Sequence, residues 1–440
     1  MSSTRFDPSG PLRGRLRPPS DKSISHRAAL IAAMGEGDEP THINGYLDGA
    51  DTLSTLAAVK ELGADVSWER NSGDGALDPP GLTARISGVG LEGARSAEID
   101  VGNAGTLLRL LPGWLAGQVG KEWRLDGDES IRRRPVDRIA VPLREMGAHL
   151  SARDDKLPPL EIEGAPLNGI TYEMPIASAQ VKSCLLFAGL LAEGETRVVE
   201  PLPSRDHTEQ MLAAAGASIE RDGEAVVVQP VECLEPEGLL VPADISSAAF
   251  FLVAAVLVPG SELEFSEVGV NPTRTGLLTI LERMGAEIER DQEVESGGEP
   301  VATLRVRSAS LQATEVGGAE IPLAIDELPL VALAACFAEG TTTIRDAEEL
   351  RRKESDRIAT VTEALRALGG KVEPTEDGMV IEGTGGLRGG TVESHGDHRI
   401  AMLGAVAGLA SRDGVEVVGM DAAAVSYPGF ESDLASLLRP

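Results

Sequence analysis

A short segment near the start of the sequence places an ammonium, a hydroxyl and a guanidinium group before an apolar run. Lys22, Ser23 and Arg27 lead into residues 28–33. The pattern predicts a helix that Asp21 or a neighbouring serine caps by accepting a backbone N–H. Ser23 and Arg27 share one face of such a helix, and its free N–H groups favour an anion. By itself, the segment fits an anion-binding site and a plain capped helix with solvated charges about equally well.

Polar residues of similar kinds stand before other apolar stretches. They are residues 102–106, 177–180, 326–327 and 395–399. Glycine lets a ligand approach backbone N–H groups closely, while hydroxyl, amide and basic groups bind oxyanions. Each of these helix starts alone is more typical of a cap than of a ligand site. Their joint occurrence favours ligand binding.

Two basic segments interrupt a chain that is strongly acidic overall. Residues 132–134 are consecutive arginines, and residues 351–357 are expected to open a helix. Lys353 and Arg357 should lie on one face of that helix, with Glu354 beside them. A solvated loop and a surface ion-pair run are the structural alternatives. Against a net charge of −30, such clusters indicate ligands that carry phosphate or carboxylate.

The composition indicates a globular chain of two large domains. It has 440 residues, 42% of them apolar, and a net charge of −30 that argues against binding to nucleic acid or anionic membranes. The longest apolar run, residues 248–258, is about half of a membrane-spanning helix. The first residues lack the apolar core of a secretory signal, and the cysteines at 184, 233 and 336 lack metal-ligand spacing. A cytoplasmic protein with reduced thiols is expected.

Motifs for nucleotide or metal chemistry are missing from the sequence. It has neither a Walker phosphate loop nor a dinucleotide glycine fingerprint after a strand. No cluster of histidine, cysteine and carboxylate residues suggests a metal, and neither His207 nor His398 adjoins a nucleophile motif. Neither a metal nor a nucleotide cofactor is therefore indicated.

A unit of two helices and several short strands recurs along the chain. In most periods an amphipathic helix ends at a glycine suited to a left-handed turn, and a β-like segment follows. These glycines are Gly63, Gly147, Gly216, Gly285 and Gly369. A nearly apolar helix recurs at residues 28–34, 107–115, 181–191, 248–258, 330–337 and 400–410. Because it is apolar all round, this second helix should be buried behind a sheet.

Six such units divide most simply into two halves of three. The sixth unit would end with a helix at residues 430–438. The proline- and glycine-rich passage 235–244 is the expected crossing between the halves, and residues 13–20 are the expected return crossing.

These residues resemble the motifs of the 5-enolpyruvylshikimate-3-phosphate synthase family, in family order and over nearly the whole chain. The matching residues are Asp21-Lys22-Ser23-Ile24-Ser25-His26-Arg27, Gly102-Asn103-Ala104-Gly105-Thr106, Arg134-Pro135, Ser178-Ala179-Gln180, Arg205-Asp206-His207-Thr208-Glu209, Asn271-Pro272-Thr273-Arg274, Ile325-Asp326-Glu327, Lys353-Glu354-Ser355-Asp356-Arg357 and Asp397-His398-Arg399. Several of these motifs are specific individually, and together they leave little room for coincidence.

The resemblance implies an α/β fold of two similar domains, each made of three βαβαββ units. This is an inside-out α/β barrel arrangement with the active site in the interdomain cleft. The implied domains are residues 21–240, and residues 1–20 with 241–440. The implied reaction joins shikimate 3-phosphate and phosphoenolpyruvate into an enolpyruvyl ether and releases phosphate, with no metal or cofactor. A monomer is expected.

The resemblance also implies functional residues. For shikimate 3-phosphate they are Lys22, Ser23, Arg27, Ser178, Ala179, Gln180, Arg205, Asp326 and Lys353. For phosphoenolpyruvate they are Lys22, Asn103, Gly105, Thr106, Arg134, Gln180, Arg357 and Arg399. The implied catalytic residues are Lys22, Asp326 and Glu354. Asp326 would accept the proton of the 5-hydroxyl, and Glu354, with Lys22, would protonate the methylene carbon of phosphoenolpyruvate.

The chain departs from the family pattern at two positions. Ala179 stands where many members have serine, which removes one hydroxyl contact to the phosphate but leaves the backbone N–H. Val425 stands where some members have a lysine that contacts phosphoenolpyruvate. Asp21, Ala179 and the segment 205–209 are similar to a subgroup with glyphosate-tolerant members. Those tolerant members carry alanine where this chain has Gly105, so inhibition by glyphosate is expected.

Three alternatives differ in what they require of the sequence. The sister enolpyruvyl transferase for UDP-N-acetylglucosamine usually has Asn after the N-terminal Lys and a reactive Cys in its second unit. Here Ser23 follows Lys22, and no cysteine lies near residues 115–135. A related RNA-terminal-phosphate enzyme would need a basic RNA-binding face. A non-catalytic repeat scaffold gives no reason for the charged motifs to stand in family order.

Overall fold

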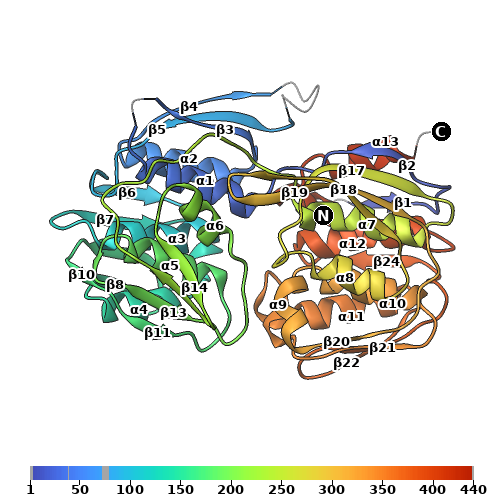
Figure 1. Cartoon of the computed structure of the whole chain (residues 1–440). Helices are drawn as coiled ribbons and strands as arrows, with labels where there is room; N and C mark the ends of the chain where they lie inside the picture. The colour runs from blue at the N-terminus through green and yellow to red at the C-terminus, as the bar shows by residue number, and fades with distance from the viewer. Residues whose placement is uncertain (1–2, 38, 72–78, 439–440) are drawn as a thin grey trace. The chain divides into compact units, whose positions relative to one another are not determined.

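Residues 3–37, 39–71 and 79–438 are described by the computed structural model, in which the chain forms two units (Figure 1). Unit 1 contains the residues up to Pro19, Ala243–Val294 and the residues from Pro300 onward. Unit 2 contains Ser20–Pro242 and the pentapeptide Glu295–Glu299. The expected domains, 21–240 and 1–20 with 241–440, differ from these units at the edges and in the pentapeptide. As functional domains they stay a prediction.

Three four-stranded sheets surround the interior of unit 2 (Figure 1). In order across each sheet, the strands are β16 (Leu239–Leu240), β3 (Thr41–Tyr46), β5 (Leu82–Ser87) and β4 (Asp65–Arg70); β6 (Ala97–Asp100), β7 (Glu122–Asp126), β9 (Leu157–Glu163) and β8 (His149–Arg153); and β11 (Thr171–Glu173), β13 (Thr196–Val199), β15 (Ala225–Val228) and β14 (Ile219–Asp222). The first pair in each sheet is parallel and the other two are antiparallel. A short parallel pair, β10 (Leu167–Asn168) and β12 (Ala192–Glu193), completes the strands described in unit 2.

Two kinds of helix alternate in unit 2. The buried ones are α1 (Lys22–Met34), α3 (Gly105–Ala116) and α5 (Ala179–Gly189), in which nearly every residue is buried. The amphipathic ones are α2 (Ala50–Glu61), α4 (Asp137–Glu145) and α6 (His207–Ala214), in which about half of the residues are buried. A one-turn 3₁₀ helix, η1 (Ile131–Arg133), precedes α4. This alternation confirms the two helix types expected from the sequence.

Unit 1 repeats the same strand order. Its sheets are β2 (Arg13–Leu16), β17 (Glu262–Gly269), β19 (Glu299–Arg307) and β18 (Ile288–Ser296); β20 (Glu315–Val316), β21 (Thr341–Ile344), β23 (Met379–Glu382) and β22 (Lys371–Pro374); and β24 (Gly390–Glu393), β25 (Val415–Val418) and β1 (Ser3–Phe6). In the last sheet, β1 pairs with β25 in antiparallel register and takes the third place. Within the described residues, the order therefore recurs in six sheets.

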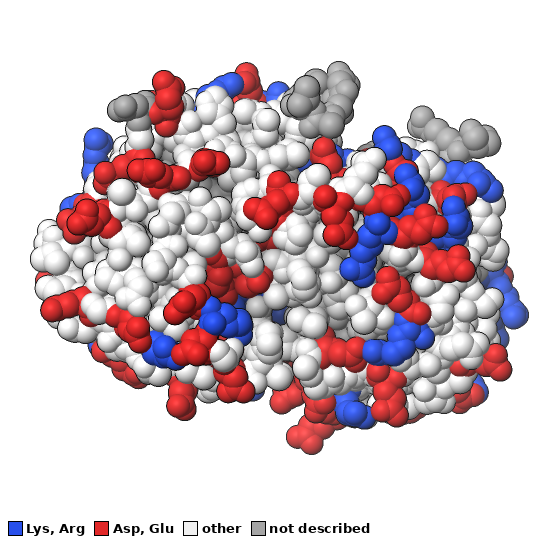
Figure 2. All heavy atoms as spheres, viewed as in Figure 1, with Lys and Arg blue, Asp and Glu red and all other residues white. Residues whose placement is uncertain are grey.

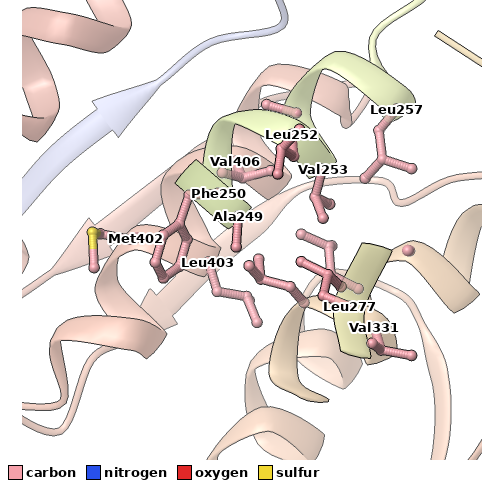
Figure 3. Close-up of a cluster of buried hydrophobic side chains, with 14 of the residues drawn as sticks. Ala249, Phe250, Leu252, Val253, Leu257, Leu277, Val331, Met402, Leu403 and Val406 are labelled. Carbon is pink, nitrogen blue, oxygen red and sulfur yellow. The ribbon is translucent and has the colours of Figure 1, made fainter. Parts of the chain in front are cut away.

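The buried helices of unit 1 pack against one another to form its core. They are α7 (Ile245–Leu257), α10 (Leu328–Phe337) and α12 (His398–Ala410). All residues of α7 are buried, and Figure 3 shows Phe250 and Val253 among Leu403 and Val406 of α12. Burying one such side chain contributes roughly 1.5–3 kcal/mol, so helices that are apolar all round are stable only inside the sheets.

Amphipathic and short helices complete unit 1. They are α8 (Gly276–Arg283), α9 (Ile321–Ala324), α11 (Arg357–Ala367) and α13 (Phe430–Leu437), with 3₁₀ turns η2 (Gly318–Glu320), η3 (Glu348–Arg352) and η4 (Met420–Val425). In the sheets that begin with β6, β11 and β20, the chain order of strand, buried helix, strand, amphipathic helix and two strands matches the expected βαβαββ unit, whereas β16, β2 and β1 reach the other three sheets from distant parts of the chain. The α/β fold of two three-unit halves, with helices inside and sheets outside each half, is therefore confirmed.

The turn glycines adopt the conformation predicted for them. Gly63, Gly147, Gly216, Gly285 and Gly369 have φ between 90° and 108°. An L side chain rarely adopts this backbone conformation, which explains why glycine recurs after α2, α4, α6, α8 and α11.

Acidic side chains are spread over the face shown in Figure 2, with basic side chains between them. This distribution fits the net charge of −30. In the described parts of the chain, no helix combines the length and the apolar character needed to cross a membrane.

Candidate active site

The start of α1 presents a hydroxyl and a basic group in unit 2. Asp21 caps the helix by accepting a backbone N–H at 2.9 Å. Lys22 is about one-third exposed, and its Nζ lies 3.4 Å from Asp51 Oδ2. Arg27 is almost fully buried, and its Nη1 donates to the backbone carbonyl of Ser23 at 3.0 Å. This segment thus offers one accessible cation, Lys22, beside one enclosed cation, Arg27.

Arg27 is fixed by hydroxyl groups of two other helices. Its Nε donates to Thr208 Oγ1 at 2.7 Å, and its Nη2 donates to Ser183 Oγ at 2.8 Å. Burial lowers the pKa of Arg27 to about 10, Glu209 opposes this shift, and Arg205 adds to it. The guanidinium therefore remains charged at neutral pH.

Five residues expected to bind phosphoenolpyruvate meet at the start of α3. Arg134 Nη2 donates to Asn103 Oδ1 at 2.9 Å, and Gln180 Nε2 donates to Thr106 Oγ1 at 3.2 Å. A Cβ added to Gly105 would lie 2.7 Å from Arg134 Nη1, closer than van der Waals contact permits. Glycine at this position therefore lets the guanidinium approach the start of the helix.

Two residues outside the expected set hold this cluster in place. Arg109 Nη1 donates to Gln180 Oε1 at 3.1 Å and to the carbonyl of Gly105 at 3.3 Å. Asp128 Oδ2 accepts from Asn103 Nδ2 at 2.7 Å. These contacts fix the orientation of the side-chain amides of Gln180 and Asn103. The oxygen and the NH₂ group of each amide therefore keep their places.

The start of α5 and the loop before α6 supply the remaining expected residues of unit 2. Ser178 caps α5 by accepting the backbone N–H of Val181 at 3.4 Å, and Ala179 is the first residue of the helix. Arg205 is partly buried and lies near enough to Arg27 to lower its pKa.

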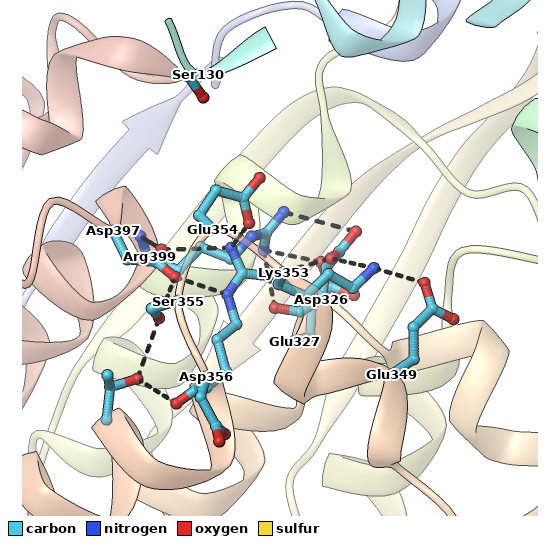
Figure 4. Close-up of polar contacts among 12 residues, drawn as sticks. Ser130, Asp326, Glu327, Glu349, Lys353, Glu354, Ser355, Asp356, Asp397 and Arg399 are labelled. Atoms are coloured by element: carbon cyan, nitrogen blue, oxygen red, sulfur yellow. Dashed lines mark hydrogen bonds and ion pairs between the residues drawn. The ribbon is translucent and has the colours of Figure 1, made fainter. Parts of the chain in front are cut away.

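A dense ionic cluster lies where α10, α11 and α12 begin in unit 1 (Figure 4). Asp326 Oδ1 lies 3.5 Å from Lys353 Nζ and 3.3 Å from Arg357 Nη1. Glu354 Oε2 accepts from Arg357 Nη2 at 2.6 Å. Arg399 Nη1 donates to the backbone carbonyl of Asp326 at 2.9 Å. All five residues expected in this half therefore lie together.

Arg357 is the centre of that cluster. Its side chain is 1% exposed, and its Nε donates to Asp397 Oδ2 at 2.9 Å. Burial disfavours the charge of Arg357, but Glu354, Asp397 and Asp326 raise its pKa above the ordinary value. Burial likewise opposes the charge of Glu354, but Arg357 and His398 outweigh it and lower the pKa of that carboxyl.

The expectation that Lys353 and Arg357 share one face of a helix is wrong. The 3₁₀ turn η3 ends at Arg352, Lys353 has extended backbone, and α11 begins only at Arg357. Asp356 caps α11 by accepting the backbone N–H of Ala359 at 3.1 Å, which sets the helix start after the charged loop. Lys353 reaches Asp326 from the loop instead.

Sequence reasoning missed several buried carboxylates. Asp397 has no exposed surface, and Glu327 Oε1 accepts from Arg399 Nη1 at 3.3 Å. Both stand next to expected residues and read as helix caps. Asp51, which is partly buried, and Asp128, which is exposed, give no signal in the sequence, because their partners Lys22 and Asn103 are far away along the chain.

The expected residues form two groups in different units. Lys22, Ser23, Arg27, Asn103, Gly105, Thr106, Arg134, Ser178, Ala179, Gln180 and Arg205 belong to unit 2, and Asp326, Lys353, Glu354, Arg357 and Arg399 belong to unit 1. A pocket of about 560 Å³ in unit 2, lined by α1, β3, α6 and the pentapeptide Glu295–Glu299, contains none of them.

Comparisons with known proteins agree with the motifs. The family model described as EPSP synthase (3-phosphoshikimate 1-carboxyvinyltransferase) matches residues 6–434. A 3-phosphoshikimate 1-carboxyvinyltransferase of Synechococcus is 48% identical over the full length of both chains. Another from Geobacter sulfurreducens is 49% identical, with 98% of each chain covered. An EPSP synthase structure from Acinetobacter baumannii has a TM-score of 0.88 at 41% identity and covers 99% of this chain and 97% of that one.

These matches extend over both units and include every charged segment described above. The chain therefore belongs to the EPSP synthase family, the 3-phosphoshikimate 1-carboxyvinyltransferases.

Proposed function

We propose that this protein transfers the enolpyruvyl group of phosphoenolpyruvate to the 5-hydroxyl of shikimate 3-phosphate, with the residue roles given below. The observation that carries these roles is the convergence of Asp326 and Glu354 with Lys353, Arg357 and Arg399. Two carboxylates among three cations provide proton-transfer groups beside groups that bind anions.

The assignment to shikimate 3-phosphate rests on hydroxyl, amide and basic groups. The residues are Lys22, Ser23, Arg27, Ser178, Ala179, Gln180 and Arg205, with Asp326 and Lys353. Ala179 lacks the hydroxyl found in many relatives, but its backbone N–H is at the N-terminus of α5 and suits an anion.

The assignment to phosphoenolpyruvate uses mainly arginines. The residues are Lys22, Asn103, Gly105, Thr106, Arg134, Gln180, Arg357 and Arg399. Arginine binds carboxylate and phosphate groups in a bidentate manner, whereas lysine supplies a compact charge. Val425, in η4, is 56% exposed and cannot replace the lysine contact of some relatives.

In the first chemical step, the 5-hydroxyl gives its proton to Asp326 while Glu354 protonates the methylene carbon of phosphoenolpyruvate. The oxygen then bonds to the resulting cationic carbon and forms a tetrahedral adduct. In the second step, the methyl group returns a proton to Glu354, the carbon–oxygen bond to phosphate breaks, and Asp326 gives the proton of the former 5-hydroxyl to the departing phosphate. Lys22 assists Glu354 in protonating the methylene carbon. At the end of the reaction Glu354 is protonated and Asp326 is ionised, as both were at the start.

Glu354 needs a higher pKa to act as a proton donor than it has in the unliganded cluster. Its pKa is lowered there, because Arg357 and His398 outweigh the effect of burial. An anionic substrate bound to Arg357 competes with Glu354 for the guanidinium and adds a negative charge nearby. Both effects raise the pKa of Glu354, so binding of phosphoenolpyruvate prepares its own proton donor.

Release of phosphate from phosphoenolpyruvate by the purified protein tests the activity. Shikimate 3-phosphate and UDP-N-acetylglucosamine are supplied in parallel as acceptors. Release only with shikimate 3-phosphate supports the proposal. Release only with the nucleotide sugar would assign the protein to the sister reaction, and no release with either, from folded protein, would favour a non-catalytic scaffold.

The variants Glu354→Gln and Asp326→Ala test the residue roles. We expect kcat to fall by at least about 100-fold in each, the usual range for loss of a general acid or base. Equilibrium binding of shikimate 3-phosphate to Glu354→Gln should change little. Near-normal turnover in either variant would refute that residue's role.

Glyphosate is proposed as an inhibitor, because Gly105 leaves the space that alanine fills in tolerant relatives. A cytoplasmic location and a monomeric state are also proposed. Cell fractionation and sedimentation of the purified protein would test them.

A further inference from the structure

Lys182 is a fully buried cation in α5 for which the proposed reaction has no direct use. Its side chain has no exposed surface. Nζ lies 3.0 Å from Glu200 Oε2 and 2.6 Å from Glu209 Oε1. Removing an ammonium group from water is costly even when it is paired, and an apolar side chain in its place is often no less stable. A purpose other than stability is therefore worth seeking.

Lys182 and Glu200 both form hydrogen bonds with Ser204, which lies in the loop between β13 and α6. Nζ of Lys182 donates to the backbone carbonyl of Ser204 at 3.3 Å. Glu200 Oε1 accepts from the backbone N–H of Ser204 at 3.1 Å and also from its Oγ. The backbone N–H, the carbonyl and the hydroxyl of Ser204 are thus all held by one ion pair.

Ser204 directly precedes Arg205, a residue proposed to bind the phosphate-bearing substrate. The loop runs from Glu200 to Asp206, between the end of β13 and the start of α6. Without regular secondary structure, its backbone position depends on such side-chain contacts. Holding the peptide groups of Ser204 therefore fixes the Cα of Arg205.

The other side of Arg205 is anchored by the same lysine. Glu209, in the first turn of α6, pairs with Lys182, and Thr208 accepts from Arg27 Nε at 2.7 Å. Lys182 therefore links the residue before Arg205 to the helix that follows it. This arrangement limits the directions from which the Arg205 guanidinium reaches a ligand.

We propose that Lys182, through Glu200 and Ser204, is a positioning residue that aims Arg205 at the phosphate of shikimate 3-phosphate. The inference rests on the proposed function. Lys182 touches no reacting atom. Its role is to keep the loop in the one conformation in which Arg205 binds the substrate.

Steady-state kinetics of Lys182→Met test the proposal. Methionine retains the length of the side chain but not its charge or donors. We expect KM for shikimate 3-phosphate to rise at least tenfold, while KM for phosphoenolpyruvate changes less than twofold and kcat less than threefold. An equal rise of both KM values would show a general structural defect and overturn the proposal.

Arg221→Met is the matched control. Arg221 Nη2 donates to Glu200 Oε2 at 2.8 Å, and its side chain is 42% exposed. This variant removes a cation from the same carboxylate without removing a contact to Ser204. We expect both KM values to remain within twofold of those of the wild-type protein. If Arg221→Met also raised KM for shikimate 3-phosphate alone, the loss of a positive charge beside Glu200 would explain the effect, and the proposed role of Ser204 would be wrong.

A double-mutant cycle with Arg205→Ala separates positioning from stability. If Lys182 acts through Arg205, Lys182→Met should not raise KM for shikimate 3-phosphate further in the Arg205→Ala background. If the fold-changes in KM of the two single variants instead multiply in the double variant, the proposal is wrong. If Lys182→Met does not fold, Ser204→Ala takes its place in the cycle, with an expected rise of about threefold. An inactive wild-type protein would refute the proposed function and this inference with it.

Discussion

His26 lies inside unit 2 with a strongly altered acidity. Its Nδ1 is 2.6 Å from Thr55 Oγ1, and the residue has no exposed surface. Burial, with smaller effects of Lys22 and Arg27, lowers the pKa of His26 to about 3. In the unfolded chain the same group titrates near 6.5. The folded protein therefore carries a neutral imidazole across the whole physiological range.

This difference predicts a loss of stability in mild acid. Between pH 6.5 and pH 3 the unfolded chain binds a proton that the folded state excludes, so the free energy of unfolding falls as pH falls. For His26 the loss between pH 7 and pH 5 is about 2 kcal/mol. Urea unfolding at both pH values should show that His26→Gln lacks this contribution. Parallel losses in the variant and the wild-type protein would contradict the assignment.

Adding a single methyl group at Gly105 should weaken the binding of phosphoenolpyruvate. In Gly105→Ala the new Cβ would stand 2.7 Å from Arg134 Nη1 and 3.2 Å from Arg109 Nη1, so the guanidinium groups must move. We expect KM for phosphoenolpyruvate to rise about tenfold, equivalent to about 1.4 kcal/mol. Because the proposed inhibition by glyphosate depends on the space beside Gly105, the glyphosate concentration for half-inhibition should rise by a larger factor. Inhibition curves of equal sensitivity would refute the steric argument.

At the scale of elements, the amphipathic helices depend on the glycines that end them. Gly216 follows α6 with φ of +92°, and a Cβ added there would meet no atom within 4 Å. Gly216→Ala should therefore lose about 1–2 kcal/mol from backbone strain alone. Gly10 has equal space without a positive φ, so Gly10→Ala is the control and should stay within about 0.5 kcal/mol of wild type. Chemical denaturation compares the two, and equal effects would exclude strain as the cause.

The sequence pattern predicts helices better than their exact starts. The apolar helix predicted at 248–258 ends one residue beyond α7 but starts three residues after it, because an all-apolar run indicates burial and does not show where the helix begins. The four-residue spacing of Lys353 and Arg357 predicts that both lie on one helix, but Asp356 caps α11 three residues after Lys353. Capping competes locally with propensity, and periodicity does not reveal which polar residue caps the helix.

The sequence also does not show which distant segments pair as strands of one sheet. The sequence predicts residues 13–20 and 235–244 only as crossings, yet β2 completes the first sheet of unit 1 and β16 completes the first sheet of unit 2. A two-residue strand such as Leu239–Leu240 has no recognisable pattern of its own. The site residues, by contrast, stand in specific motifs, so their identities were available before their contacts.

For the whole molecule, the net charge of −30 predicts a marked response to salt. Excess negative charge repels itself more strongly in the compact state than in the unfolded chain. Raising potassium chloride from about 0.05 M to about 1 M shortens the screening length from over 10 Å to about 3 Å. We expect the thermal midpoint to rise over this range. A constant or falling midpoint would show that paired charges already balance the repulsion.

The pentapeptide Glu295–Glu299 limits how such enzymes can be recombined. It interrupts the part of the chain that forms unit 1, yet Ser296 hydrogen-bonds both backbone groups of Leu240, and Glu299 Oε1 lies 2.7 Å from His207 Nδ1. A chimera that takes only residues 20–242 from one parent therefore receives Leu240 and His207 from that parent but Ser296 and Glu299, which bind them, from the other. Crossover libraries should transfer the pentapeptide with that segment, and parents that differ at either end of the His207–Glu299 pair should yield few folded offspring.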